Sequence, residues 1–108
     1  ALPISVVSNY YEALNKKDYR GAYRYLSARA MERYGTFELW EQAMTKDEVP
    51  KVKAIQLNYV SQDQDDDIVV NYMGFTVTFE DNLEPLLVRL HNEGKGWGIV
   101  AIEAAEED

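Results

Sequence analysis

The sequence contains no cysteine, and this absence excludes several chemistries at once. Without a thiol the chain has no disulfide, no thiolate nucleophile and no cysteine-ligated zinc site. Histidine is nearly absent as well, because His91 is the single example in 108 residues. A lone histidine with no partner at metal-ligand spacing is a weak ligand. We therefore expect no metal centre and no other cofactor.

Positive charge is also scarce. The chain has 11 Lys and Arg residues against 19 Asp and Glu residues, which gives a net charge of −8. Binding to nucleic acid depends on lysine and arginine that displace counterions from phosphates, so this composition argues against a nucleic-acid partner. No apolar run approaches the roughly 18 residues that a membrane-spanning helix needs, and we expect no membrane insertion by this domain.

The residues that are present fit one globular domain covering 1–108, since 46% are hydrophobic and 28% are charged. A chain of this length buries roughly two thirds of its unfolded surface around one core. Charge is unevenly distributed along it. Residues 1–54 carry 9 basic and 7 acidic side chains, whereas residues 55–108 carry 2 basic and 12 acidic ones. Such a dipolar surface can steer a protein partner or a second copy of the chain.

The first half repeats its apolar residues every three or four positions, which predicts helices. A first helix should begin at Pro3, and a second should follow the capping residue Asp18. Ser27 can cap a further turn, and Thr36 a third amphipathic helix. The expected apolar stripes are Ile4, Val7, Tyr11 and Leu14, then Tyr19, Ala22, Tyr23 and Leu26, then Phe37, Trp40 and Met44.

From Lys51 onward apolar and polar residues alternate, as in half-buried strands. Strands are expected around 55–59, 68–79, 86–90 and 97–102, with the polar run 61–67 as a turn. Another turn should start at Asp81–Asn82, and residues 92–96 should form a hairpin loop.

The long strand at 68–79 changes phase partway. Its apolar residues are even-numbered at first and odd-numbered later, so we predict a β-bulge near Met73–Gly74. The two sets are Ile68, Val70 and Tyr72, followed by Phe75, Val77 and Phe79.

Two segments carry a resemblance to a known family. The opening segment reads Val7-x-x-Tyr10-Tyr11-x-Ala13-Leu14-x-x-x-Asp18-Tyr19-x-x-Ala22-Tyr23-x-x-Leu26-Ser27, and the closing one reads Gly94-Lys95-Gly96-Trp97-Gly98-Ile99-Val100. With helices followed by a bent antiparallel meander, they resemble the nuclear transport factor 2-like superfamily. This resemblance implies an α+β fold, with N-terminal helices packed on a curved antiparallel sheet of about four strands, cone-like in shape.

The chain most resembles the small accessory domains of bacterial lipoproteins and membrane-anchored proteins. The resemblance thus implies an extracytoplasmic or membrane-anchored location in a bacterium. The superfamily includes isomerases, dehydratases, epoxide hydrolases and transport adaptors, so the fold leaves the function open.

An isomerase or dehydratase of this kind needs an acid or base inside the cone, often with a tyrosine beside it. The predicted inward strand positions contain no carboxylate and no histidine, and neither do the helix stripes. Those strand positions are Ile55, Leu57, Tyr59, Phe75, Val77, Phe79, Leu86, Val88 and Leu90. We therefore predict no catalytic residue.

Three interpretations follow from this absence. The favoured one is a non-catalytic binding or interaction module of an exported or membrane-anchored bacterial protein. The alternative is a small-molecule enzyme, of the isomerase, dehydratase or hydrolase type, acting on an apolar ligand in the cone cavity. A purely structural spacer, with a filled cone, is the third.

Two polar features have simpler explanations than chemistry. His91 alternates with Leu90, so an exposed or edge-lying strand position is favoured over a catalytic base. The acidic run Asp63-x-Asp65-x-Asp67 resembles the start of a calcium loop. An EF-hand is excluded because Ile68 stands where glycine is needed and Gly74 where a bidentate glutamate is needed. A solvated hairpin is the expected structure.

Aromatic residues are abundant, with 8 Tyr, 2 Trp and 3 Phe. Tyrosine combines apolar area with a hydroxyl, which suits both pocket walls and interfaces. Core filling is the simpler explanation of stripes at helical spacing. If the cone holds a small apolar ligand, we predict that its wall includes Tyr11, Tyr23, Trp40, Tyr59 and Tyr72.

The family resemblance also implies that a homodimer is possible through the outer face of the sheet. That face should include Thr76, Thr78, Arg89 and His91. It is too polar to require an obligate dimer.

Overall fold

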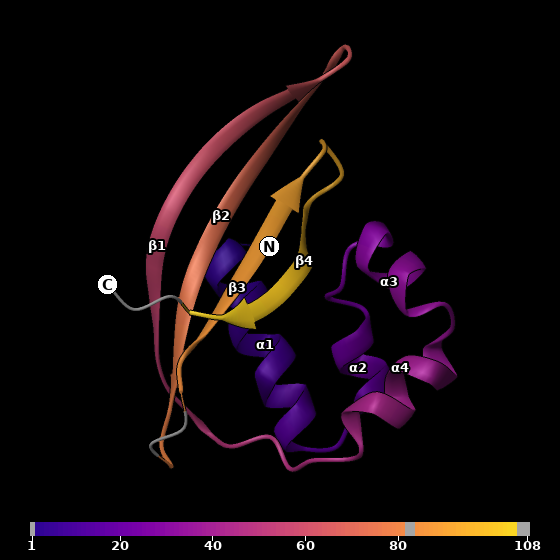
Figure 1. The fold of residues 1–108 in the computed structure, drawn as a ribbon, viewed down its shortest axis with the longest axis vertical. Helices are drawn as coiled ribbons and strands as arrows, with labels where there is room; N and C mark the ends of the chain where they lie inside the picture. Colours follow the sequence, from indigo (N-terminus) through magenta and orange to yellow (C-terminus); the bar gives the residue numbers. More distant parts are fainter. Residues whose placement is uncertain (1, 82–83, 106–108) are drawn as a thin grey trace.

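A computed structural model describes residues 2–81 and 84–105 (Figure 1). In these residues four helices pack on a four-stranded antiparallel open sheet, which confirms the predicted α+β class. The elements are α1 (Pro3–Asn15), α2 (Tyr19–Tyr23), α3 (Ala28–Tyr34), α4 (Phe37–Met44), β1 (Val52–Asp65), β2 (Ile68–Phe79), β3 (Leu86–Asn92) and β4 (Trp97–Ala104).

The helices begin where local capping chemistry predicts. Pro3 is the first residue of α1, and the side chains of Asp18, Ser27 and Thr36 each accept a hydrogen bond from the backbone N–H three residues later. These bonds satisfy N–H groups that have no partner inside the helix.

The second helix is shorter than its apolar stripe predicts. It ends at Tyr23 because the backbone around Leu26 pairs with β4 as an isolated parallel bridge to Ile99. Ser27 N–H donates to the Ile99 carbonyl at 2.8 Å, and Ile99 N–H donates to the Tyr25 carbonyl at 2.8 Å. The same contact joins the helical half of the chain to the last strand.

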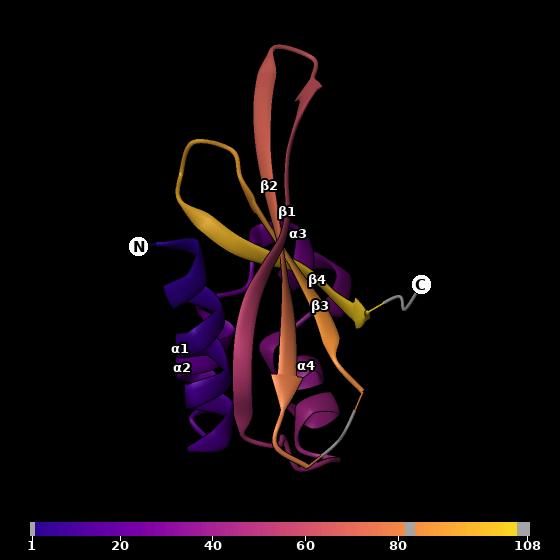
Figure 2. The same cartoon turned by 90° about the vertical axis from the view of Figure 1, so that its left-hand side faces the viewer.

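The sheet has the strand order β1-β2-β3-β4 and curves around α1 (Figure 1). We call the concave face toward the helices the inner face and the opposite one the outer face. The sheet is strongly twisted, so the two hairpins diverge (Figure 2). The β1–β2 hairpin extends well beyond the helices (Figure 1), and we call its outer part, residues 60–73, the arm. Most of its side chains are exposed, although Val70 is buried.

A β-bulge does lie beside Gly74, close to the predicted Met73–Gly74 position, but the extra residue belongs to β1 and not to β2. The pairing of β2 with β3 runs without a shift from Asn71 to Val77, and the irregularity lies on β1, between Leu57 and Tyr59. It turns Tyr59, predicted to face inward, onto the outer face, where its ring covers Gly74. The phase change in β2 has a different cause. Val69 and Asn71, the inner-face positions between Met73 and the hairpin turn, are exposed, so apolar residues are not required there. Val70, which points to the opposite face, is buried instead.

The polar run 61–67, predicted as a turn, is mostly strand. β1 continues to Asp65, and only Asp66 and Asp67 form the turn, with Asp66 in the left-handed region at φ 56°. Aspartate tolerates this conformation. A polar run can extend as a strand here because neither face of the arm is packed against helices. Among the described residues, no three potential metal-ligating side chains come together. The turn predicted at Asp81–Asn82 reaches outside the described residues.

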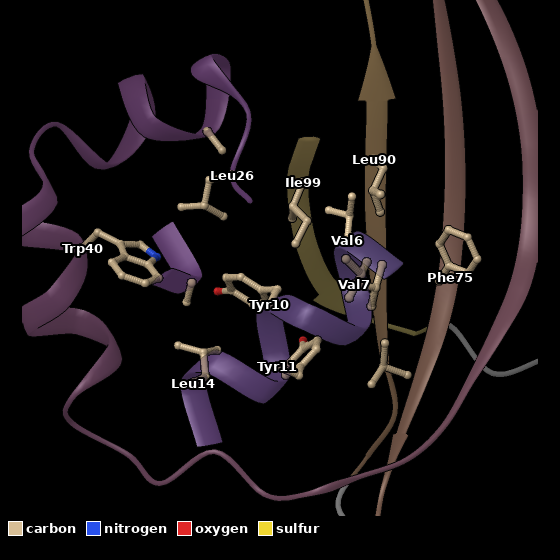
Figure 3. Packing of buried hydrophobic residues seen from close by; sticks show 14 of the residues in the cluster. Val6, Val7, Tyr10, Tyr11, Leu14, Leu26, Trp40, Phe75, Leu90 and Ile99 are labelled. Atoms are coloured by element: carbon tan, nitrogen blue, oxygen red, sulfur yellow. The ribbon is translucent and has the colours of Figure 1, made fainter. Parts of the chain in front are cut away.

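The core lies between α1 and the inner face of the sheet (Figure 3). Val7 of α1 and Val77, Val88 and Leu90 of the sheet are fully buried, and Ile99 is nearly so. A second, aromatic group joins α2 to α4. Its rings belong to Tyr19, Tyr23, Phe37 and Trp40, with the guanidinium of Arg20 4.2 Å from the centre of the Phe37 ring.

Candidate functional site

An apolar groove of about 570 Å³ opens between α1, the segment after α4 and the inner face of the sheet. Its volume lies within the range of small-molecule sites. The lining residues are Tyr10, Tyr11, Leu14, Tyr34, Met44, Glu48, Val49, Pro50, Phe79, Glu84, Leu86 and Ile102. They come from three helices, two connecting segments and three strands.

Two buried tyrosines of α1 form part of the groove wall. The Tyr10 and Tyr11 rings meet edge to face at 5.2 Å, and Tyr11 meets Phe79 in the same way at 5.5 Å. Burial raises the pKa of both phenols well above the ordinary value of 10, and for Tyr10 the nearby Tyr11 and Tyr34 add to this rise. Both hydroxyls are therefore neutral at physiological pH, able to donate or accept hydrogen bonds.

Tyr10 is a lining residue of the groove and is itself 2% exposed. Its hydroxyl donates a weak hydrogen bond to the Met44 sulfur at 3.8 Å. The indole nitrogen of Trp40 is on the side of its ring that faces Tyr10 (Figure 3). This buried N–H makes no hydrogen bond of normal geometry in the described structure. Its proximity to the Tyr10 hydroxyl still lowers the pKa of Tyr10 slightly, although burial, which raises this pKa, has the larger effect.

The charged residues of the groove lie at its rim. Glu48 follows α4 and Glu84 precedes β3, and both side chains are exposed to solvent. They are the charged groups among the described lining residues, and both are acidic. The groove thus combines an apolar interior with an acidic edge.

A neighbouring hollow of about 500 Å³ shares Leu14, Glu48 and the Val49–Pro50 segment with the groove. Most of its other walls are charged, from Lys17, Lys46, Asp47, Lys51, Glu80 and Asp81. Charged groups lose hydration when an apolar molecule covers them, so this hollow suits an apolar ligand poorly.

The prediction that His91 is exposed or edge-lying is wrong, because only 6% of the residue is accessible. It stacks on Tyr72 with a ring distance of 6.2 Å. Its Nδ1 lies 3.7 Å from an Oε1 of Glu93, which also pairs with Arg29 of α3 at 2.5 Å. Burial lowers the pKa of His91; Arg29 lowers it further, and Glu93 opposes both. The alternation of apolar and polar residues along β3 could not predict this burial, because the contacts come from Tyr72 of β2 and from residues outside β3.

This environment predicts a pH dependence of stability. Because the folded-state pKa of His91 is below the unfolded value near 6.5, the unfolded chain takes up the proton first as pH falls. Stability from the neutral histidine is fully present above pH 6.5 and is lost below it. Urea unfolding between pH 5 and 8 should show a flatter profile for His91→Gln than for the wild type. Parallel profiles would contradict this assignment.

The five predicted ligand-binding residues do not lie together. Tyr11 lines the groove. Tyr23 and Trp40 contact each other at 5.1 Å in the aromatic group of α2 and α4. Tyr59 lies on the outer face, and Tyr72 stacks on His91.

Sequence reasoning missed most of the groove. Tyr10 could have been found, since it follows Val6 by four residues and precedes Leu14 by four, which widens the apolar face of α1. Val49 and Pro50 belong to an irregular segment, and Leu86 and Ile102 come from the ends of their strands. Their convergence depends on tertiary structure alone.

Comparison with known proteins adds no assignment, because no protein-family model and no curated protein sequence matches this chain. None of the helices in the described residues is long and apolar enough to cross a membrane. The function therefore has to be argued from the groove itself.

Proposed function

We propose that this chain is a non-catalytic binding module that holds a small apolar ligand in the groove between α1 and the sheet. One observation carries the proposal. The groove has the volume of a ligand site and is lined mainly by apolar and aromatic side chains, among them two tyrosines that stay neutral at physiological pH. Such a lining gains free energy when an apolar molecule displaces water from it.

The ionisable groups of the groove support binding over catalysis. An isomerase or dehydratase holds its acid or base in the interior, where burial tunes the pKa. Here the described lining offers Glu48 and Glu84 at an exposed rim, and tyrosines whose raised pKa makes them poor bases. His91 is not among the lining residues. The enzyme alternative would have to use one of the rim carboxylates.

The proposal includes the family and location that the sequence resemblance implies. The curved sheet with helices on its concave face supports membership of the nuclear transport factor 2-like superfamily (Figure 1). An origin in an exported or membrane-anchored bacterial protein rests on the resemblance of the opening and closing segments. A protein partner or a homodimer remains part of the same hypothesis. The outer face carries polar groups such as the Asn58–Thr76 hydrogen bond and the Arg89–Tyr59 hydrogen bond.

A groove-filling substitution tests the binding function. Ile102→Trp adds a large ring to the groove lining and is expected to weaken binding at least tenfold, because the ring occupies the ligand's volume. The measurement is a fluorescence titration with N-phenyl-1-naphthylamine, a neutral apolar probe. Leu39→Trp is the matched control, since Leu39 is an exposed α4 residue outside the groove lining. Circular dichroism checks that both variants fold. Equal binding by wild type and Ile102→Trp, or no binding by the wild type, would overturn the proposal.

A further inference from the structure

The acidic rim of the groove points to the kind of molecule it holds. The charged side chains in its described lining are Glu48 and Glu84. Glu48 belongs to the segment after α4, and Glu84 belongs to the segment before β3. The adjoining hollow, which Glu48 also lines, has three lysines against four carboxylates, so it supplies no excess of positive charge. A bound molecule with its apolar part in the groove would expose its end to two carboxylates.

We propose that the ligand is an apolar molecule with a cationic end, such as a long-chain amine; this inference rests on the proposed binding function. The chain's net charge of −8 attracts cations from a distance, and the two carboxylates act at short range.

The opposite choice, an apolar anion such as a fatty acid, meets unfavourable electrostatics at the same place. Its carboxylate would lie beside Glu48 and Glu84 with no basic residue among the described lining to pair with it. The attraction or repulsion between unit charges a few ångström apart in water corresponds to about fivefold in affinity. Two such carboxylates therefore predict a cation that binds more than tenfold tighter than an anion of equal chain length.

A set of matched probes tests the inference. Decyltrimethylammonium, decanol and decanoate share one alkyl chain and differ in the charge of the end group. Each displaces N-phenyl-1-naphthylamine from the wild-type protein, the two ionic probes below their micelle concentrations and decanol below its solubility limit. The expected order of affinity is the cation first, the alcohol second and the anion last. The order should compress in high salt, because salt screens exposed charges.

Two variants of equal net charge separate local recognition from the overall field. The double variant Glu48→Gln/Glu84→Gln should bind the three probes with affinities within about threefold of one another. Glu32→Gln with Glu38→Gln is the control, since these exposed helix residues are outside the groove lining. It should keep the wild-type order.

The outcomes distinguish this inference from the function on which it rests. Equal displacement by all three probes would overturn the cationic ligand and leave the apolar groove intact. A loss of preference that is the same in both double variants would also overturn it, because net charge alone would then explain the order. If the neutral probe does not bind the wild type, the proposed function itself fails.

Discussion

Leu90→Ala is expected to lower the free energy of unfolding by about 2–5 kcal/mol. Leu90 lies at the middle of β3 on the inner face and has no solvent exposure. Truncation removes its buried methyl groups and leaves a cavity that the surrounding core, including Ile99 across the β3–β4 pair, can fill only in part. Urea unfolding followed by circular dichroism measures the change.

Leu57→Ala is the matched control for this prediction. Leu57 is also a leucine on the inner face of the sheet, but it is 50% exposed and lies on β1, away from the centre of the core. Its truncation should cost less than about 1 kcal/mol. Similar losses for the two variants would contradict the position assigned to the core.

Gly74→Ala is expected to destabilise the protein by about 1–3 kcal/mol through crowding. A Cβ at this position would lie 2.1 Å from Cε1 of Tyr59, and the Tyr59 hydroxyl accepts a hydrogen bond from Arg89 at 2.9 Å. The Tyr59 ring must move away, which breaks its hydrogen bond with Arg89 and removes its packing against Gly74. The φ angle of Gly74 is not in the left-handed region, so backbone strain does not contribute.

A double-mutant cycle with Tyr59→Ala isolates this crowding. Once the ring is absent, adding Gly74→Ala should cost almost nothing, which gives a coupling free energy of about 1 kcal/mol or more. The measurement is urea unfolding of the two single variants and the double variant. Additive losses would show that the methyl group is harmful for a reason other than Tyr59.

The sequence predicted most reliably those features that depend on neighbouring residues. The starts of the helices follow from the capping side chains Asp18, Ser27 and Thr36, each of which bonds within three residues of itself. The four strands follow from alternation of apolar residues. The α+β class follows from the order of these two patterns along the chain.

Features that depend on distant residues were predicted less well. The apolar residues of β2 change from even to odd positions, which indicates that the buried face of the strand changes. This pattern cannot show whether the extra residue of a bulge belongs to β2 or to its partner strand β1. The early end of α2 depends on Ile99, more than 70 residues further along the chain. The groove combines Tyr10 with Ile102 and the irregular segment at Val49–Pro50, so its tyrosine wall differs from the one predicted from helix stripes.

The bulge in β1 also affects how this protein behaves at high concentration. β1 is a 14-residue strand at the end of the sheet order, and no described segment pairs with its other side. A long free edge with exposed apolar residues such as Leu57 and Val60 is a template for intermolecular strand addition and aggregation. The irregularity between Leu57 and Tyr59 interrupts the regular spacing of its outward N–H and C=O groups. We therefore expect the same local distortion that places Tyr59 over Gly74 to disfavour edge-to-edge assembly.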